Sequence, residues 1–121
     1  MRPRSFMEYV DMALKELPEE FSQRLENLVI TVEPYPNRED LESVGLRDRR
    51  HLLGLFRGLP FGHVGSFHAG PVMPSEIVLY QKNIERIART ERELVEQIRA
   101  TLLHEIGHYF GMTEEELSEY T

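Results

Sequence analysis

Cysteine is absent from the 121-residue sequence. Its absence excludes disulfide scaffolds, cysteine zinc fingers, iron–sulfur clusters and thiol nucleophiles. Any metal site must therefore be built from histidine and carboxylate side chains. Long apolar runs are also lacking: no segment approaches the ~20 apolar residues that a membrane span requires, and the first residues contain no stretch typical of a signal peptide. We therefore expect a cytoplasmic protein that has no membrane partner.

Positive charge is in short supply, with 14 basic residues against 21 acidic ones and a formal net charge of -7. Such a chain repels phosphate backbones, so we expect no nucleic-acid partner. Apolar residues make up 40% of the sequence, which is ordinary for a globular protein. The length fits one domain over residues 1–121 with one hydrophobic core, and nothing in the sequence predicts an oligomeric state.

The first third of the chain has the pattern of two helices and a strand. A capping box that begins at Ser5, followed by apolar residues at three- and four-residue intervals, predicts a helix over residues 6–17. Pro18 ends this helix and opens a shorter one through Leu25. The β-branched run at 28–32 predicts a strand that is buried on both faces.

The middle of the chain combines short elements with a long loop. A short helix is expected from its cap, Asn37, to its stop, Gly45. Strands are expected at 52–57 and 76–80. Between these strands, the four glycines and three prolines of residues 58–75 predict an irregular loop.

The longest predicted helix covers residues 91–110, between a capping box at Thr90 and a left-handed stop at Gly111. At about 100° per residue its apolar side chains fall within one arc of roughly 120° that must face the core. They are Leu94, Val95, Ile98, Leu102, Ile106 and Tyr109. His104 and His108 lie about 40° apart beside one edge of this arc, so they share a face at the rim of the core.

The sequence around these histidines is H-E-x-x-H, with Glu105 between them. Imidazoles at i and i+4 of a helix can converge on one ion at about 2.0–2.1 Å. Glu105 cannot easily join them as a ligand, but it can reach a water on the metal and take its proton as general base. The alternative is that His104 and His108 are surface residues favoured by the negative end of the helix dipole.

Two histidines leave a zinc site one short of its usual three protein ligands. Because Gly111 can break the helix, the chain can double back and present Glu114 to the metal. Glu115 is the next candidate for this position. Glu114 also has a structural interpretation, since Thr113 and Glu116 form another capping box in which Glu114 is an ordinary acid of the first turn.

The stretch 104–114 thus reads H-E-x-x-H-x-x-G-x-x-E and resembles the extended zinc motif of metzincin-like peptidases. The whole chain resembles the family of small bacterial zincin-like metallopeptidases. The similarity is carried by Ala13-Leu14, Leu17-Pro18, Val32-Glu33, Gly54-Leu55-Phe56, Val78-Leu79-Tyr80 and the segment from Leu103 through Gly111. The resemblance implies that His104, His108 and Glu114 are zinc ligands and that Glu105 is the catalytic base. Glu114 departs from the family, whose members usually have Asp at this position.

The resemblance also implies a fold and a way of binding substrate. We expect an α+β protein with the minimal zincin fold, in which a small mixed sheet of about three strands packs on helix 91–110, with the leading helix on the same side. In zincins an antiparallel edge strand lies above the active helix. By that analogy, residues 52–57 bind a peptide or protein substrate as an added strand.

The predicted activity is zinc-dependent hydrolysis of peptide bonds by a metal-activated water, with Glu105 as general base. The rival hypothesis is a non-catalytic binding or regulatory module that retains the zincin fold, which the small size and the unusual Glu114 favour. A third hypothesis is a metal-dependent hydrolase that acts on substrates other than peptides.

Further histidines and tyrosines are candidates for the site. They are His63 and His68, and the conceivable oxyanion donors Tyr80, Tyr109 and Tyr120. His63 and His68 lie in the long loop, where they could contact substrate or replace a ligand, although solvated loop histidines are more common. His51 is expected to be structural, and Tyr109 belongs to the arc that faces the core.

Overall fold

The computed structural model describes residues 5–22, 28–57 and 75–119. Its helices and strands follow in the order α1 (Phe6–Lys15), α2 (Glu19–Ser22), β1 (Leu28–Glu33), α3 (Arg38–Ser43), the 3-10 helix η1 (Arg49–His51), β2 (Gly54–Arg57), β3 (Ser75–Tyr80), α4 (Gln81–Ile87), α5 (Glu91–Tyr109) and α6 (Glu114–Ser118). The loop expected at 58–75 lies outside the described residues except for its last position. None of the helices in the described ranges has both the length and the apolar character of a membrane span.

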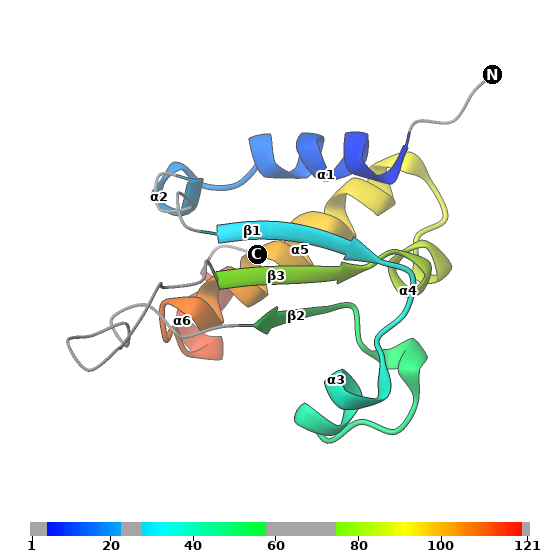
Figure 1. Ribbon diagram of the computed structural model, residues 1–121. Coiled ribbons are helices and arrows are strands. Elements are labelled where there is room, and N and C mark those ends of the chain that lie inside the picture. The colour runs from blue at the N-terminus through cyan, green and yellow to red at the C-terminus, as the bar shows by residue number, and fades with distance from the viewer. Residues whose placement is uncertain (1–4, 23–27, 58–74, 120–121) are drawn as a thin grey trace.

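The three strands form one mixed sheet in the order β1-β3-β2, which confirms the predicted α+β class (Figure 1). β1 is parallel to β3, and β2 is antiparallel to β3 with Gly54 opposite Leu79. The expectation that β1 is buried on both faces is wrong. The central position belongs to β3, whose residues 77–80 have no exposed surface, whereas Val29 on the edge strand β1 is 46% exposed.

Helix α5 passes behind the sheet in Figure 1 and packs against β2 and β3, with α1 beside it. The apolar arc predicted for this helix is largely confirmed, because Val95, Ile98, Leu102 and Ile106 are at most 1% exposed. They join α1 residues such as Val10 in the hydrophobic core. Burial of these apolar side chains contributes about 25 cal/mol per Å² of apolar surface, and it is the main contribution that stabilises the packing of α5 on the sheet.

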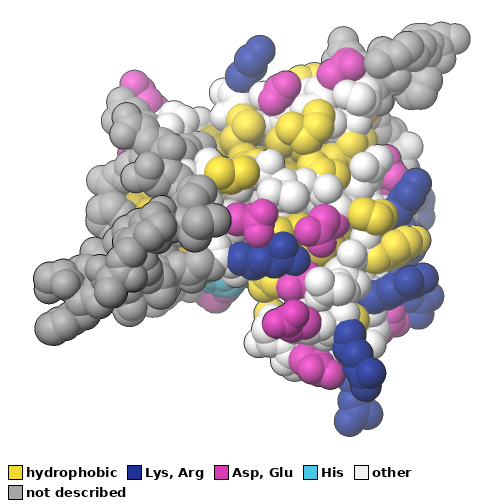
Figure 2. Space-filling model, viewed as in Figure 1, with side chains coloured by type: hydrophobic (Ala, Val, Ile, Leu, Met, Phe, Trp, Pro, Cys, Tyr) yellow, Lys and Arg dark blue, Asp and Glu magenta, His cyan; other side chains and the backbone are white. Residues whose placement is uncertain are grey.

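A network of charged side chains lies on the sheet face opposite α5, and Figure 2 shows a basic group there among acidic ones. Arg57 pairs with Asp40 of α3, with Glu76 at 3.1 Å and with Glu33 at 3.4 Å. The Tyr80 hydroxyl donates to Asp40 Oδ2 at 2.9 Å. Burial and the Asp40 carboxylate raise the pKa of Tyr80. The network therefore ties α3 to the end of the edge strand β2, and it commits the Tyr80 hydroxyl to Asp40 rather than to the cleft beside α5.

Candidate metal centre

The two histidines and the glutamate of the H-E-x-x-H sequence lie on the last two turns of α5. The capping box predicted at Thr90 is present and fixes the start of this helix. The His104 and His108 rings face each other edge to face, with centroids 4.5 Å apart. Both imidazoles are near half exposed, at 42% and 45%, whereas the Glu105 side chain is 11% exposed. The histidines thus remain accessible to an ion while Glu105 lies between helix and sheet.

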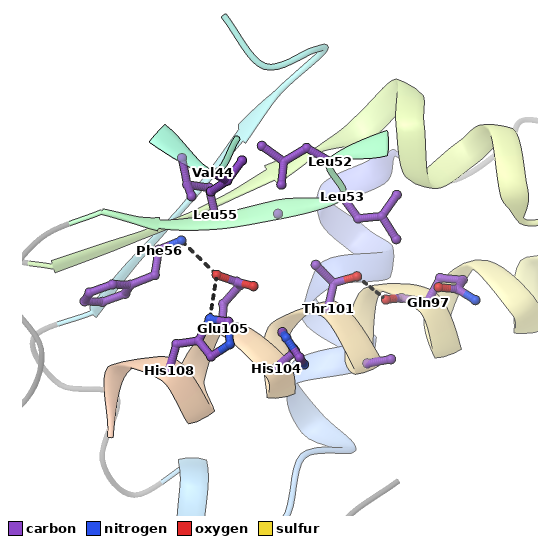
Figure 3. A pocket seen from close by; sticks show the side chains of 12 residues that line it. Val44, Leu52, Leu53, Leu55, Phe56, Gln97, Thr101, His104, Glu105 and His108 are labelled. Atoms are coloured by element: carbon purple, nitrogen blue, oxygen red, sulfur yellow. Dashed lines mark hydrogen bonds and ion pairs between the residues drawn. The ribbon is translucent and has the colours of Figure 1, made fainter. Parts of the chain in front are cut away.

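Glu105 points toward the edge strand β2 (Figure 3). Its Oε1 atom accepts a hydrogen bond from the main-chain N–H of Phe56 at 3.0 Å and lies 3.6 Å from His108 Nδ1. Burial raises the pKa of Glu105, while the two histidines and the Phe56 N–H act in the opposite direction. The carboxyl group is therefore held in a fixed position beside the histidines, in surroundings that make it more basic than an exposed glutamate.

The chain reverses direction after α5, as Gly111 predicted. Gly111 has φ +71°, a left-handed conformation that suits glycine. The Met112 N–H donates to the carbonyl of Gly107 at 2.9 Å, and a capping box at Thr113 starts α6. Glu114, the first residue of α6, is thereby placed beside the two histidines.

The Glu114 carboxylate lies close to both imidazoles. Its Oε1 atom is 3.1 Å from His104 Nε2 and 3.8 Å from His108 Nε2. Within the described part of the chain, Glu115 forms no ion pair with either histidine. Of the two candidates for the third position, the structure therefore brings Glu114 and not Glu115 to the site.

The distances from Glu114 to the two histidines are close to those between ligands of one zinc ion. Nitrogen and oxygen ligands at about 2.0–2.2 Å in a tetrahedral arrangement stand roughly 3.3–3.5 Å apart. The distances from Glu114 to the two Nε2 atoms, 3.1 and 3.8 Å, lie on either side of this value. Among the described residues, His104, Glu105 and His108 also form a group with donor atoms close enough together to hold a metal ion.

A cavity of about 560 Å³ opens beside the histidines, between β2 and α5. Figure 3 shows Val44, Leu52 and Leu55 on one side of it and α5 side chains on the other. Its lining is mainly apolar and comprises Val44, Leu52, Leu53, Gly54, Leu55, Phe56, Gln97, Ala100, Thr101, His104, Glu105 and His108. An apolar group of a ligand that binds in this cleft therefore lies next to the histidines and Glu105.

The edge of β2 that faces away from β3 borders this cleft. The Tyr80 N–H donates to the Leu53 carbonyl, and Leu55 and Arg57 are the positions of the same parity. Since main-chain groups of an antiparallel strand alternate in direction, those of Gly54 and Phe56 point away from β3. The Phe56 N–H, which Glu105 accepts, is one of them. Sequence reasoning missed this contact, because a main-chain donor has no side-chain signature.

Gly54 allows β2 to approach α5 closely. A Cβ atom there would lie 2.6 Å from Thr101 Cγ2 and 3.2 Å from the Val78 carbonyl oxygen. We predict that Gly54→Ala lowers the free energy of unfolding by about 1–3 kcal/mol, as overpacking does elsewhere. Denaturant titration measures this loss.

Adding Thr101→Ser to the Gly54→Ala variant should restore part of the lost free energy of unfolding. Serine lacks the colliding methyl but keeps a hydroxyl, which in Thr101 donates to the Gln97 carbonyl at 2.8 Å. Thr101→Ser alone is the control. Equal stability of Gly54→Ala and the unmodified protein would contradict the close contact.

The remaining candidate residues lie elsewhere or are otherwise engaged. His51 lies in η1, outside the site. Its side chain is exposed, and its Nε2 atom is 3.8 Å from Asp48 Oδ2. The Tyr109 ring packs on Phe56, with centroids 5.3 Å apart. His63, His68 and Tyr120 lie outside the described residues.

Comparison with known protein families agrees with this architecture. The model of the zincin-like metallopeptidase family matches residues 25–121, a range that contains the sheet, α5 and Glu114. Comparison with curated proteins finds no match. The mixed sheet packed on a helix that carries H-E-x-x-H is consistent with a zincin-like fold. The chain therefore belongs to the family of zincin-like metallopeptidases.

Proposed function

We propose that this protein is a zinc-dependent peptidase in which His104, His108 and Glu114 bind the ion and Glu105 is the general base. The observation that carries the proposal is the approach of His104 Nε2 and His108 Nε2 to one oxygen of Glu114, at 3.1 and 3.8 Å. Glu105 lies beside this donor set with its carboxyl group fixed by the Phe56 N–H. Family membership favours the same activity.

Zinc, when bound, supplies a Lewis acid that favours attack of water on the scissile carbonyl. Glu105 takes the proton of the attacking water and then returns it to the leaving amine. The burial that raises the pKa of Glu105 moves this group toward the range in which a carboxylate is an effective base. His108 Nδ1 lies 3.6 Å from Glu105 Oε1, so the proposed base and this proposed ligand are neighbours.

We propose an extended peptide as substrate, added to the sheet at the edge of β2 that faces away from β3. Gly54 and Phe56 offer outward main-chain groups there, and the apolar cleft receives a side chain next to the reacting bond. A substrate carbonyl that accepts the Phe56 N–H replaces Glu105 as its partner. Substrate binding then releases the Glu105 carboxylate from this hydrogen bond, and the carboxylate can act as the general base.

The direct test is cleavage of a mixed peptide library, with new termini identified by mass spectrometry. We expect cleavage by the zinc-loaded protein, its loss after treatment with a chelator, and its return when zinc is added back. Cleavage that persists in the chelator would contradict a zinc peptidase. Stoichiometric zinc without cleavage of any peptide would favour a non-catalytic module with the zincin fold, and chelator-sensitive hydrolysis of other compounds alone would favour a different hydrolase.

A further inference from the structure

A leucine of helix α6 packs on a glycine of α5. Leu117 is 3% exposed, and it is the only buried residue within α6. A Cβ atom added to Gly107 would collide with Leu117 Cδ2 and would lie 2.7 and 2.9 Å from Leu117 Cδ1 and Cγ. The leucine side chain therefore rests directly on the bare main chain of α5, one residue before the ligand candidate His108.

The contact between Leu117 and Gly107 stabilises α6 more than the main-chain hydrogen bonds within this short helix can. α6 has five residues, far fewer than the roughly 12–15 that an isolated helix needs even in a favourable sequence. Its other supports are the capping box at Thr113 and the turn in which Met112 donates to the Gly107 carbonyl. Both supports fix the start of α6, and Leu117 is the residue of α6 whose buried side chain packs on α5.

Glu114 and Leu117 are three residues apart in α6, and residues at this spacing lie on the same side of a helix. The side that packs on Gly107 is therefore the side that turns Glu114 toward His104 and His108. Glu114 itself is 73% exposed, so packing of its own side chain does not hold it there.

We infer that Leu117 is a positioning residue for the metal site, and that its packing on Gly107 holds Glu114 beside His104 and His108. The inference rests on the proposed role of Glu114 as a ligand. Leu117 touches none of the ligand atoms and acts only through the placement of α6. Since metal–ligand distances must hold within about 0.2 Å, a small displacement of α6 is enough to weaken the site.

The glycine has no evident role in the helix itself. Gly in a helix interior is less favourable than Ala by about 0.5–1 kcal/mol. The structure gives the reason for Gly107, because a methyl group at this position occupies the space of the Leu117 side chain. Gly107→Ala therefore forces the Leu117 side chain to move, and we expect α6 to move with it while every proposed ligand is kept.

Zinc affinity, measured by competition with a chromophoric chelator, tests the inference. We expect Gly107→Ala and Leu117→Ala each to bind zinc about 10–100-fold more weakly, the range typical for loss of a group that orients a ligand. Leu117→Met, which conserves volume, should stay close to the unmodified protein. Gly107→Ala keeps the inference testable if Leu117→Ala does not fold.

The two changes should not add. In the double variant Gly107→Ala/Leu117→Ala, the new methyl no longer meets the three leucine atoms. We therefore expect zinc affinity at least equal to that of Leu117→Ala. A further loss equal to that of Gly107→Ala alone would show that the two residues act independently and would overturn the inference.

A matched control separates metal binding from stability. Ile84→Ala removes a fully buried side chain of α4, which lies at the opposite end of the sheet from α6 (Figure 1). It should lower the free energy of unfolding but keep zinc affinity. If Gly107→Ala and Leu117→Ala bind zinc like the unmodified protein while Glu114→Ala does not, the positioning role is wrong and the ligand assignment stands. Unchanged affinity in Glu114→Ala would overturn the assignment, and the inference with it.

Discussion

Glu105→Gln should lower kcat/KM for peptide hydrolysis by about 10²–10⁴-fold, the usual contribution of a positioned general base. Glutamine has the same shape, and its amide oxygen can still accept the Phe56 N–H that Glu105 accepts at 3.0 Å. It lacks only the basic carboxylate. The variant should therefore fold and retain zinc, so that the loss reports proton transfer alone.

Steady-state rates and metal content are measured on the same preparation of Glu105→Gln. Glu115→Gln is the matched control, because this substitution removes the same charge from an exposed glutamate at the same end of the molecule. We expect it to keep full activity. Unchanged turnover in Glu105→Gln, with zinc bound, would contradict the mechanism.

Zinc binding should require Glu114 and both histidines but not Glu115. His104→Ala, His108→Ala and Glu114→Ala should each weaken zinc binding more than the loss of a group that only orients a ligand. Such a loss typically lowers metal affinity by roughly 10–100-fold. The side chains are 42%, 45% and 73% exposed, and substitutions at such positions usually change stability by less than about 0.5 kcal/mol. Weaker binding would therefore not reflect unfolding.

Isothermal titration with zinc, on protein first stripped of metal, measures these affinities. Glu115→Ala is the control for Glu114→Ala, because it shortens the neighbouring side chain of the same helix. Equal losses in the two glutamate variants would mean that the charge of α6, and not one ligand, attracts the ion. Equal affinity of Glu114→Ala and the unmodified protein would remove Glu114 from the site.

The parts of the fold that local chemistry determines were predictable from the sequence. Helix α5 begins after its capping residue Thr90 and ends before Gly111, as those residue types indicate. Asn37 likewise caps α3 through the Asp40 N–H at 2.8 Å. The reversal of the chain toward the histidines was also predictable, because Gly111 permits it.

The parts that depend on long-range packing were not predictable in the same way. The β-branched run of β1 indicates a strand but not its place in the sheet, so its edge position was missed. Helix α4 has only two strongly apolar residues, Ile84 and Ile87, too few to show a helical period. The bond from Phe56 to Glu105 joins residues far apart in sequence, and only the folded chain reveals it.

X-ray absorption at the zinc edge of the zinc-loaded protein tests the central claim most directly. We expect one ion per chain, with two imidazole nitrogens and at least one carboxylate oxygen at about 2.0–2.2 Å. Loss of one imidazole from this spectrum in His108→Ala would agree with the arrangement. A protein that takes up no stoichiometric zinc, or an ion that has fewer than two imidazole ligands, would contradict it.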